Sequence, residues 1–335
     1  MLHARKIIPL IRSRIPTSIR APHIFAVTPR RPTSSKANAP RMSVSTQLEA
    51  QYQRNPHPDF KEVEASRPDW DQDAHFHYTK TAAPSWKFGD GANPLHHTSS
   101  PKKHVTIDPY EPGRPAPFNY KLLISSIVPR PIGFVSTQSA DGGARNLAPF
   151  SYFQMVNHDP PLFVVGVAGA LAHPKDTLRN LVESHECTVN IVSEGFLEAA
   201  NATSVDAPYG LSEWDVSGLT PAADCVDVKA PRVAEAVFSV ECKVESIREF
   251  ESRATPGKKT GCLVILEGTR FWAREDAVNE ERNMLDPAVL RPVCRLGGIT
   301  YGRVTEAIEI PRPVFAKDVG GVEGYEKLKA KAKKT

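Results

Sequence analysis

The chain has 335 residues, of which 40% are hydrophobic and 30 are prolines, so a globular core is combined with long irregular segments. Its net charge of +4 is concentrated at the amino end: residues 1–48 carry seven Arg and two Lys and no acidic residue, and without these nine charges the remainder carries −5. This balance excludes a basic nucleic-acid surface in the folded part, and no apolar run approaches the roughly 18 residues that a membrane span requires.

Five cysteines are spread along the sequence without a C-x-x-C pair, and their number is odd. This pattern predicts free thiols in a reducing compartment rather than disulfides or a zinc site. Cys242 and Cys262 fall in segments with strand-like alternation, which favours a place in the core.

Residues 1–48 predict a mitochondrial presequence. The segment is cationic, free of acidic residues, and carries isoleucines among its positive charges, which is typical of an amphipathic targeting segment. Pro9 and Pro16 limit any helix there, so a disordered basic leader is the alternative. A second start at Met42 would give a cytosolic form.

Residues 49–117 predict an extended lead-in, because they are polar, rich in Pro and His, and show no sustained period of 3.6 or 2. Aromatic residues within the lead-in predict that parts of it lie on the domain: Trp70, Phe76, Tyr78, Trp86 and Phe88. At the other end, residues 316–335 are predicted to form a Lys-rich tail, whose last residues, 327–335, predict a solvated, frayed helix.

Regular structure is predicted between these segments, over residues 118–315 as one domain. Helices are predicted over 119–128, 175–184 and 194–203, and strands over 132–138, 145–156, 162–168, 187–192, 237–247 and 262–272. The strand at 237–247 alternates: one face is predicted to carry Phe238, Val240, Cys242 and Val244, and the opposite face Glu241, Lys243 and Glu245. Hairpin-paired strands with few helices predict an antiparallel barrel.

The usual nucleotide and hydrolase motifs are missing from the sequence: it has no G-x-G-x-x-G between strand and helix, no Walker loop and no G-x-S-x-G. Hydrogen-bonding residues instead gather at strand ends and at one helix start: Ser136, Thr137, Asn146, Ser151, Lys175 and Thr177. A helix N-terminus holds a phosphate readily, and Lys175 would add a full charge. Asp176 would repel a phosphate, so we expect it to cap the helix.

Each of these residues has a plainer interpretation. Asn146 could be a turn residue, Ser136 and Thr137 ordinary strand surface, Lys175 a solvated charge, and Arg130 a charge at a helix end. Taken together and in this order they indicate a binding site, because turns and strand surfaces do not require all of these polar residues at once.

The ordered segments "PRPIGFVST", "NLAPFSYF", "DPPL", "KDTLRNL", "NIV" and "ANAT" resemble the flavin reductase-like domain family, the FMN-binding split barrels of the flavoredoxin type, over about Asn119 to Arg303. The resemblance implies a mainly β fold with flanking helices, a six-stranded antiparallel split barrel that forms a homodimer and holds FMN near the subunit interface. It implies an FMN-binding oxidoreductase that takes hydride from NADH or NADPH, with a partner oxygenase as one acceptor of the reduced flavin. An FMN-binding electron carrier without its own nicotinamide turnover is the alternative.

The resemblance also implies which residues bind FMN. The flavin edge would be lined by Arg130 to Thr137, including Ser136. The ring and the phosphate would be faced by Asn146, Leu147, Ala148, Pro149 and Ser151. The phosphate would be bound by Lys175 and Thr177, and the ring would be reached by Tyr301. Because the cofactor carries the chemistry, no catalytic acid or base is expected, and no metal.

Overall fold

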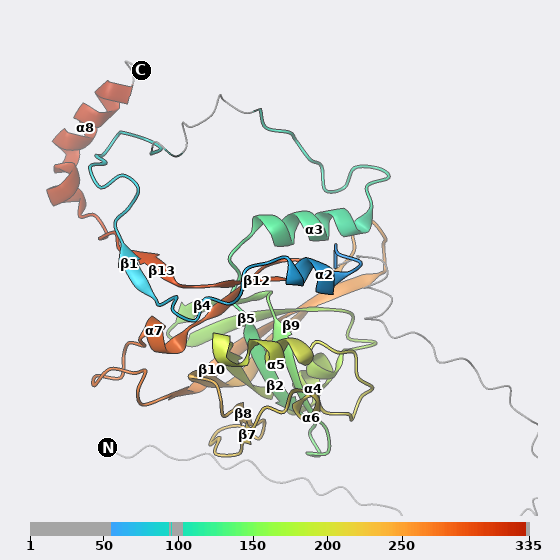
Figure 1. Cartoon of the computed structure of the whole chain (residues 1–335). Coiled ribbons are helices and arrows are strands. Elements are labelled where there is room, and N and C mark those ends of the chain that lie inside the picture. Colours follow the sequence, from blue (N-terminus) through green and yellow to red (C-terminus); the bar gives the residue numbers. More distant parts are fainter. Residues whose placement is uncertain (1–54, 94, 96–102, 333–335) are drawn as a thin grey trace, which may run out of the picture. The chain divides into compact units, whose positions relative to one another are not determined.

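The computed structural model describes residues 55–93, 95 and 103–332 (Figure 1). The leader predicted over residues 1–48 lies outside these described residues. In the described part the main sheet has seven strands, all paired antiparallel, in the order β3-β2-β6-β9-β10-β5-β4. The strands are β2 (Gly133–Gln138), β3 (Arg145–Phe150), β4 (Phe153–His158), β5 (Pro161–Ala168), β6 (Glu186–Ile191), β9 (Phe238–Glu251) and β10 (Lys259–Ala273).

The mainly β fold is confirmed, but the sheet has seven strands in the described residues where six were predicted. The strand predicted over residues 145–156 is two strands, β3 and β4, with a break at Ser151 and Tyr152. These consecutive strands are the two outer strands of the sheet. Because only two residues join them, the sheet must curl until its edges approach each other, which gives a barrel that is split between β3 and β4.

The corner between β3 and β4 depends on a glycine. A Cβ atom on Gly133 would lie 2.7 Å from two carbons of the Phe153 ring, closer than real side chains approach. We expect Gly133→Ala to lower the free energy of unfolding by about 1–3 kcal/mol through overpacking, as measured by urea denaturation. Gly195→Ala is the control, since its new Cβ would meet only Ser193 Oγ at 3.8 Å. Equal stabilities for the two variants would contradict this account of the corner.

Strand β2 is buried on both faces, which explains why its sequence does not alternate. Phe134 packs in one core cluster with Leu147, Phe196 and Trp214, while Val135 packs in another inside the curled sheet with Val165, Leu178 and Val264. The helices that cover this region are α4 (Asp176–Ser184), α5 (Leu197–Ala202) and α6 (Glu213–Ser217). Helix α4 lies against β2 and α6 lies against β3 (Figure 1).

The remaining elements are short, apart from two helices. They are α2 (Phe60–Ala65), β1 (His77–Thr79), α3 (Ala116–Ser126), η2 (Glu194–Phe196), β7 (Pro221–Ala222), β8 (Arg232–Val233), α7 (Pro287–Leu290), β11 (Val293–Gly297), β12 (Thr300–Arg303), β13 (Glu306–Ile308), η3 (Phe315–Val319) and α8 (Gly321–Ala332). All five cysteines are free thiols and four are buried, as predicted. No helix in the described ranges combines the length and apolar character needed to cross a bilayer.

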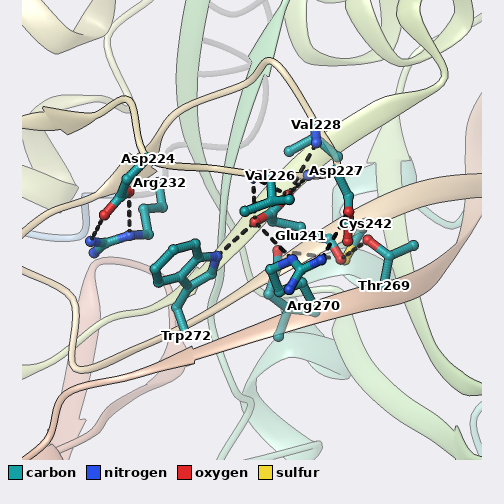
Figure 2. A network of polar contacts seen from close by, with 11 residues as sticks. Asp224, Val226, Asp227, Val228, Arg232, Glu241, Cys242, Thr269, Arg270 and Trp272 are labelled. Carbon is teal, nitrogen blue, oxygen red and sulfur yellow. Dashed lines mark hydrogen bonds and ion pairs between the residues drawn. The ribbon is translucent and has the colours of Figure 1, made fainter.

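Glu241 is fully buried although it carries a charge. It points away from Val240 and Cys242, as predicted, and the loop over residues 224–230 covers that side of β9. Figure 2 shows the backbone N–H groups of Val226 and Val228 and the indole of Trp272 converging on its carboxylate. Burial by itself would raise the pKa of Glu241, but these donors outweigh it, so the pKa lies below its ordinary value. Glu241 thus fastens the loop to the sheet.

Part of the lead-in contacts the domain through its aromatic residues, as predicted. The Arg303 guanidinium lies 4.0 Å from the Trp70 ring centre and donates to the carbonyl oxygens of Asp71 and Ala74. The same guanidinium forms an ion pair with Glu194 at 2.9 Å. Further along, β1 pairs in parallel with β13 (Figure 1). The lead-in also contains regular structure, namely helix α2, and the side chain of Asp59 caps the N-terminus of this helix.

Candidate functional site

Four polar side chains form a buried cluster where β2 and β3 meet α4. Thr137 and Asn146 are direct partners in the β2–β3 ladder, and α4 supplies Thr177 and Asn180. The Asn146 amide and the Thr177 hydroxyl are 2.8 Å apart, and Asn180 Nδ2 donates to Thr137 Oγ1 at 3.1 Å. All four side chains are buried, so their hydrogen bonds fix α4 against the end of the strands. Thr137 and Thr177 therefore support the surface beside them.

Glu213 joins this cluster, and no sequence signal pointed to it. Its Oε2 accepts from the backbone N–H of Leu147 at 3.2 Å. With the Asn146 amide turned so that its nitrogen faces Glu213, Asn146 donates to Oε2 at 3.3 Å and accepts from Thr177 Oγ1. Burial is the main cause that raises the pKa of Glu213, with Asp176 adding to it. The carboxyl thereby holds the Asn146–Leu147 segment in place.

The raised pKa of Glu213 predicts a pH-dependent stability. The folded state binds the Glu213 proton more tightly than the unfolded state does, so protonation of Glu213 stabilises the fold at acid pH. This stabilisation is lost as the pH rises from about 4.3, the ordinary pKa of Glu, through the raised pKa. Glu213→Gln removes this loss while keeping an acceptor for Leu147. We expect the melting temperature of the wild type to fall relative to Glu213→Gln between acid and neutral pH. The exposed Glu198→Gln is the control, and a pH-independent difference for Glu213→Gln would contradict the assignment.

The N-terminus of α4 opens beside this cluster. Lys175 is its exposed N-cap residue, and no side chain in the described ranges caps the helix by a hydrogen bond. The expectation that Asp176 caps α4 is therefore wrong: Asp176 is the first helical residue and is half-buried. Burial raises the pKa of Asp176, and Asp206 adds to the shift. The first amides of α4 and Lys175 together make a place where an anion is favoured.

Strand β3 begins next to that helix end and runs away from it toward Ser151. It pairs with β2 on one side only, and on the other side Glu213 accepts from the Leu147 N–H, so the remaining outward backbone groups are left for another partner. Ala148, Pro149 and Ser151 are partly exposed along this edge, where a proline is tolerated. Beneath them, Ser136 is fully buried and its hydroxyl has no hydrogen-bond partner among the residues that the structure describes.

Two predicted residues lie at the opposite end of β2. Arg130 is buried, and its guanidinium donates to the carbonyl oxygens of Ile124 and Ile127 at the end of α3. Tyr301 lies beyond it, across the backbone bridge from Arg130 to Arg295; its hydroxyl donates to Asn201 at 2.8 Å, and burial raises its pKa. Since β2 has six residues, this end is about 20 Å from the α4 end. The structure thus gathers Thr137, Asn146, Lys175 and Thr177 at the α4 end, while Arg130 and Tyr301 lie at the other end, toward which β3 runs through Pro149 to Ser151.

A metal site finds no support in the described part of the chain, where no three potential ligand side chains come together. The polar groups that do converge are amides and hydroxyls from β2, β3 and α4, the carboxyl of Glu213, and one lysine beside a helix start. A curled antiparallel sheet with such an edge defines a split-barrel protein suited to an anionic, hydrogen-bonding ligand.

Comparison with known proteins identifies the family. The model of the flavin reductase-like domain matches residues 125–290. The uncharacterized protein BH2278 of Halalkalibacterium halodurans is 35% identical over 60% of this chain and 93% of its own length. The chain therefore belongs to the flavin reductase-like domain family.

Two solved structures share the fold. Nitrilotriacetate monooxygenase component B from Bacillus cereus is 33% identical with a TM-score of 0.58, over 63% of this chain and 100% of that one. The 2-nitrobenzoate 2-nitroreductase NbaA of Pseudomonas fluorescens is 29% identical with a TM-score of 0.54, over 64% of this chain and 98% of its own.

The mitochondrial location predicted from the basic leader is contradicted by these comparisons. BH2278 and three further relatives, 32–37% identical to this chain, come from bacteria, which have no mitochondria. A cationic segment with scattered isoleucines is a compositional pattern, and composition of this kind does not require a targeting role.

Proposed function

We propose that the protein is a flavin reductase that binds FMN at the β3 edge and the N-terminus of α4, and takes hydride from NADH or NADPH. The observation that carries the proposal is the helix start of α4, with Lys175 at its N-cap, beside the partly exposed edge of β3. The split-barrel domain over residues 118–315 carries this function, with the lead-in over residues 49–117 and the tail over residues 316–335 as additions to it.

The residues present fit a flavin mononucleotide. Lys175 and the first amides of α4 suit its phosphate, and the backbone along Ala148 to Ser151 offers donors and acceptors to a flat polar ring. The unpartnered Ser136 hydroxyl suits a further polar contact near that edge. Thr177 and Thr137 act through Asn146 and Asn180, which they hold, and Arg130 acts by anchoring α3.

The bound flavin would supply the redox chemistry: one hydride from the nicotinamide and one proton from water give oxidised nicotinamide and reduced flavin. The chain then needs only to position two rings and to keep the phosphate bound. The Glu213–Asn146–Thr177 contacts serve this purpose, since they fix the segment that the flavin would touch. We propose that the protein works as a homodimer and passes reduced flavin to an oxygenase, in keeping with its likeness to a monooxygenase component.

The proposal is tested by absorption spectroscopy. Purified full-length protein is mixed with FMN, freed of unbound flavin, and titrated anaerobically with NADH and with NADPH. Bleaching of the bound flavin near 450 nm by either donor is the expected result. Protein that takes up no FMN would refute flavin binding, whereas bound FMN that neither donor reduces would instead establish the electron carrier.

A second candidate function is the reduction of a small nitroaromatic compound by the same bound flavin. It is favoured by the 29% identity to a 2-nitrobenzoate 2-nitroreductase. Donor oxidation that is stimulated by 2-nitrobenzoate, with the nitro compound consumed in step, would support it. Donor oxidation that responds to free flavin and not to 2-nitrobenzoate would support the flavin reductase.

A further inference from the structure

A surface hollow of about 310 Å³ lies where the lead-in meets the C-terminal part of the chain. Its volume is at the lower end of the roughly 300–1,000 Å³ of pockets that hold small molecules. Both walls lie outside residues 125–290, which the flavin reductase-like domain model matches. The lining residues are Trp86 and Phe88 from the lead-in, and Pro311, Arg312, Pro313 and Asp318 from the segment after β13. None of them belongs to the proposed flavin site.

Contacts on both sides of the hollow hold its two walls together. Before it in the chain, β1 pairs with β13 (Figure 1). After it, α8 packs closely on the turn that follows Phe88, since a Cβ atom on Gly89 would lie 3.1 Å from Leu328 Cδ2. Asp90 in the same turn forms an ion pair with Lys331 of α8 at 3.5 Å. The hollow is therefore formed by two segments that are joined at both ends.

The lead-in wall is an aromatic corner. The ring centres of Trp86 and Phe88 are 5.6 Å apart and their planes meet at 70°. The Trp86 indole N–H donates to the carbonyl oxygen of Gly91 at 2.8 Å, so its polar atom is already satisfied. The indole is 46% exposed, and what it offers is apolar ring surface. Across from it, Pro311 and Pro313 add rings without an N–H group. This corner suits an apolar side chain, above all an aromatic one.

Two opposite charges line the same hollow. Arg312 and Asp318 form no ion pair with each other, and the Arg312 guanidinium has no ion-pair or hydrogen-bond partner among the residues that the structure describes. Asp318 Oδ2 accepts from the backbone N–H of Val314 at 2.6 Å, while Oδ1 accepts no hydrogen bond from a described residue. A guanidinium and a carboxylate oxygen thus remain to bind a ligand.

A ligand with one charge would satisfy one of these groups and be repelled by the other. A free α-amino acid carries a carboxylate and an ammonium group on one carbon, next to its side chain. We propose that the hollow binds a free amino acid with an aromatic side chain. Its carboxylate accepts from Arg312, its ammonium donates to Asp318, and its ring packs in the corner of Trp86 and Phe88. A polyproline peptide would pack on the same rings, but its uncharged backbone would leave both charges without a partner.

The first test uses L-phenylalanine as the probe, titrated into the full-length protein and followed by nuclear magnetic resonance of the ligand. Three analogues each lack one part: 3-phenylpropanoate has no ammonium group, 2-phenylethylamine has no carboxylate, and L-alanine has no ring. L-phenylalanine is expected to bind about tenfold more tightly than each of them, because each loses one contact to the hollow.

The second test pairs each variant with the analogue that lacks the matching group. Arg312→Gln should weaken L-phenylalanine about tenfold and should not weaken 2-phenylethylamine, which has no carboxylate to lose. Asp318→Asn keeps an acceptor for Val314; it should weaken L-phenylalanine and should not weaken 3-phenylpropanoate. The matched control is Arg253→Gln, which removes an exposed arginine from the loop between β9 and β10 and should change nothing.

Three results would overturn the inference: wild type that binds no L-phenylalanine, analogues that bind as tightly as L-phenylalanine, and an Arg312→Gln that weakens L-phenylalanine and 2-phenylethylamine alike. A proline-rich peptide that binds where L-phenylalanine does not would assign the hollow to a protein partner instead. FMN binding is measured in parallel, and Arg312→Gln should bind FMN like the wild type. Wild type that binds L-phenylalanine without FMN would refute only the proposed function, and the reverse result would refute only the amino-acid site.

Discussion

Glu241→Ala is expected to lower the free energy of unfolding by about 3–5 kcal/mol, the largest effect of any substitution considered. The carboxylate is fully buried and accepts from the backbone of Val226, Asp227 and Val228 and from the Trp272 indole at 2.7 Å (Figure 2). Its removal leaves these buried donors without an acceptor and Arg270 without one of its two acidic neighbours. Urea denaturation at pH 7 measures the loss.

The pH dependence of this difference gives a second readout. Because the folded-state pKa of Glu241 lies below its ordinary value, its stabilisation is complete above about pH 4.3 and is lost as the pH falls through the lowered pKa. The difference between wild type and Glu241→Ala should therefore shrink in acid. Glu245→Ala, which removes an exposed carboxylate from the same strand, should change stability by less than about 0.5 kcal/mol. A loss for Glu241→Ala no larger than this control would contradict the anchoring role.

Lys175→Ala is expected to raise the dissociation constant for FMN by about 10- to 100-fold, because a charge-assisted contact to the phosphate is removed at an exposed position. Fluorescence quenching of FMN on binding measures the change. Riboflavin, which has the same ring without the phosphate, should bind wild type and Lys175→Ala equally. The exposed Lys258→Ala serves as the control for a general loss of positive charge.

Two outcomes would move the phosphate site away from α4. One is an unchanged affinity for FMN in Lys175→Ala, and the other is an equal loss for FMN and riboflavin. Asp176→Asn offers an independent check, since removing a negative charge from the first turn of α4 should strengthen FMN binding.

Much of the secondary structure follows from local pattern. Alternation over 237–247 and the amphipathic spacing over 175–184 identified β9 and α4 to within a few residues, since each period is imposed by the backbone itself. The order of motifs also indicated the family, which the match of the flavin reductase-like domain model over residues 125–290 confirms. The break between β3 and β4 was missed because nothing local in "PFSYFQ" distinguishes one long strand from a corner.

By itself the sequence determined the β-rich class, the free thiols and the polar residues that come together at α4, because periodicity and composition are properties of the chain. Only the tertiary structure decided which of these residues are buried and which stay exposed. It buried Thr137, Thr177 and Glu241, drew Glu213 to Asn146, and separated Arg130 and Tyr301 from Lys175. Burial and partner choice depend on which segments cover a strand, and contacts such as that between Leu147 and Glu213 join residues 66 positions apart.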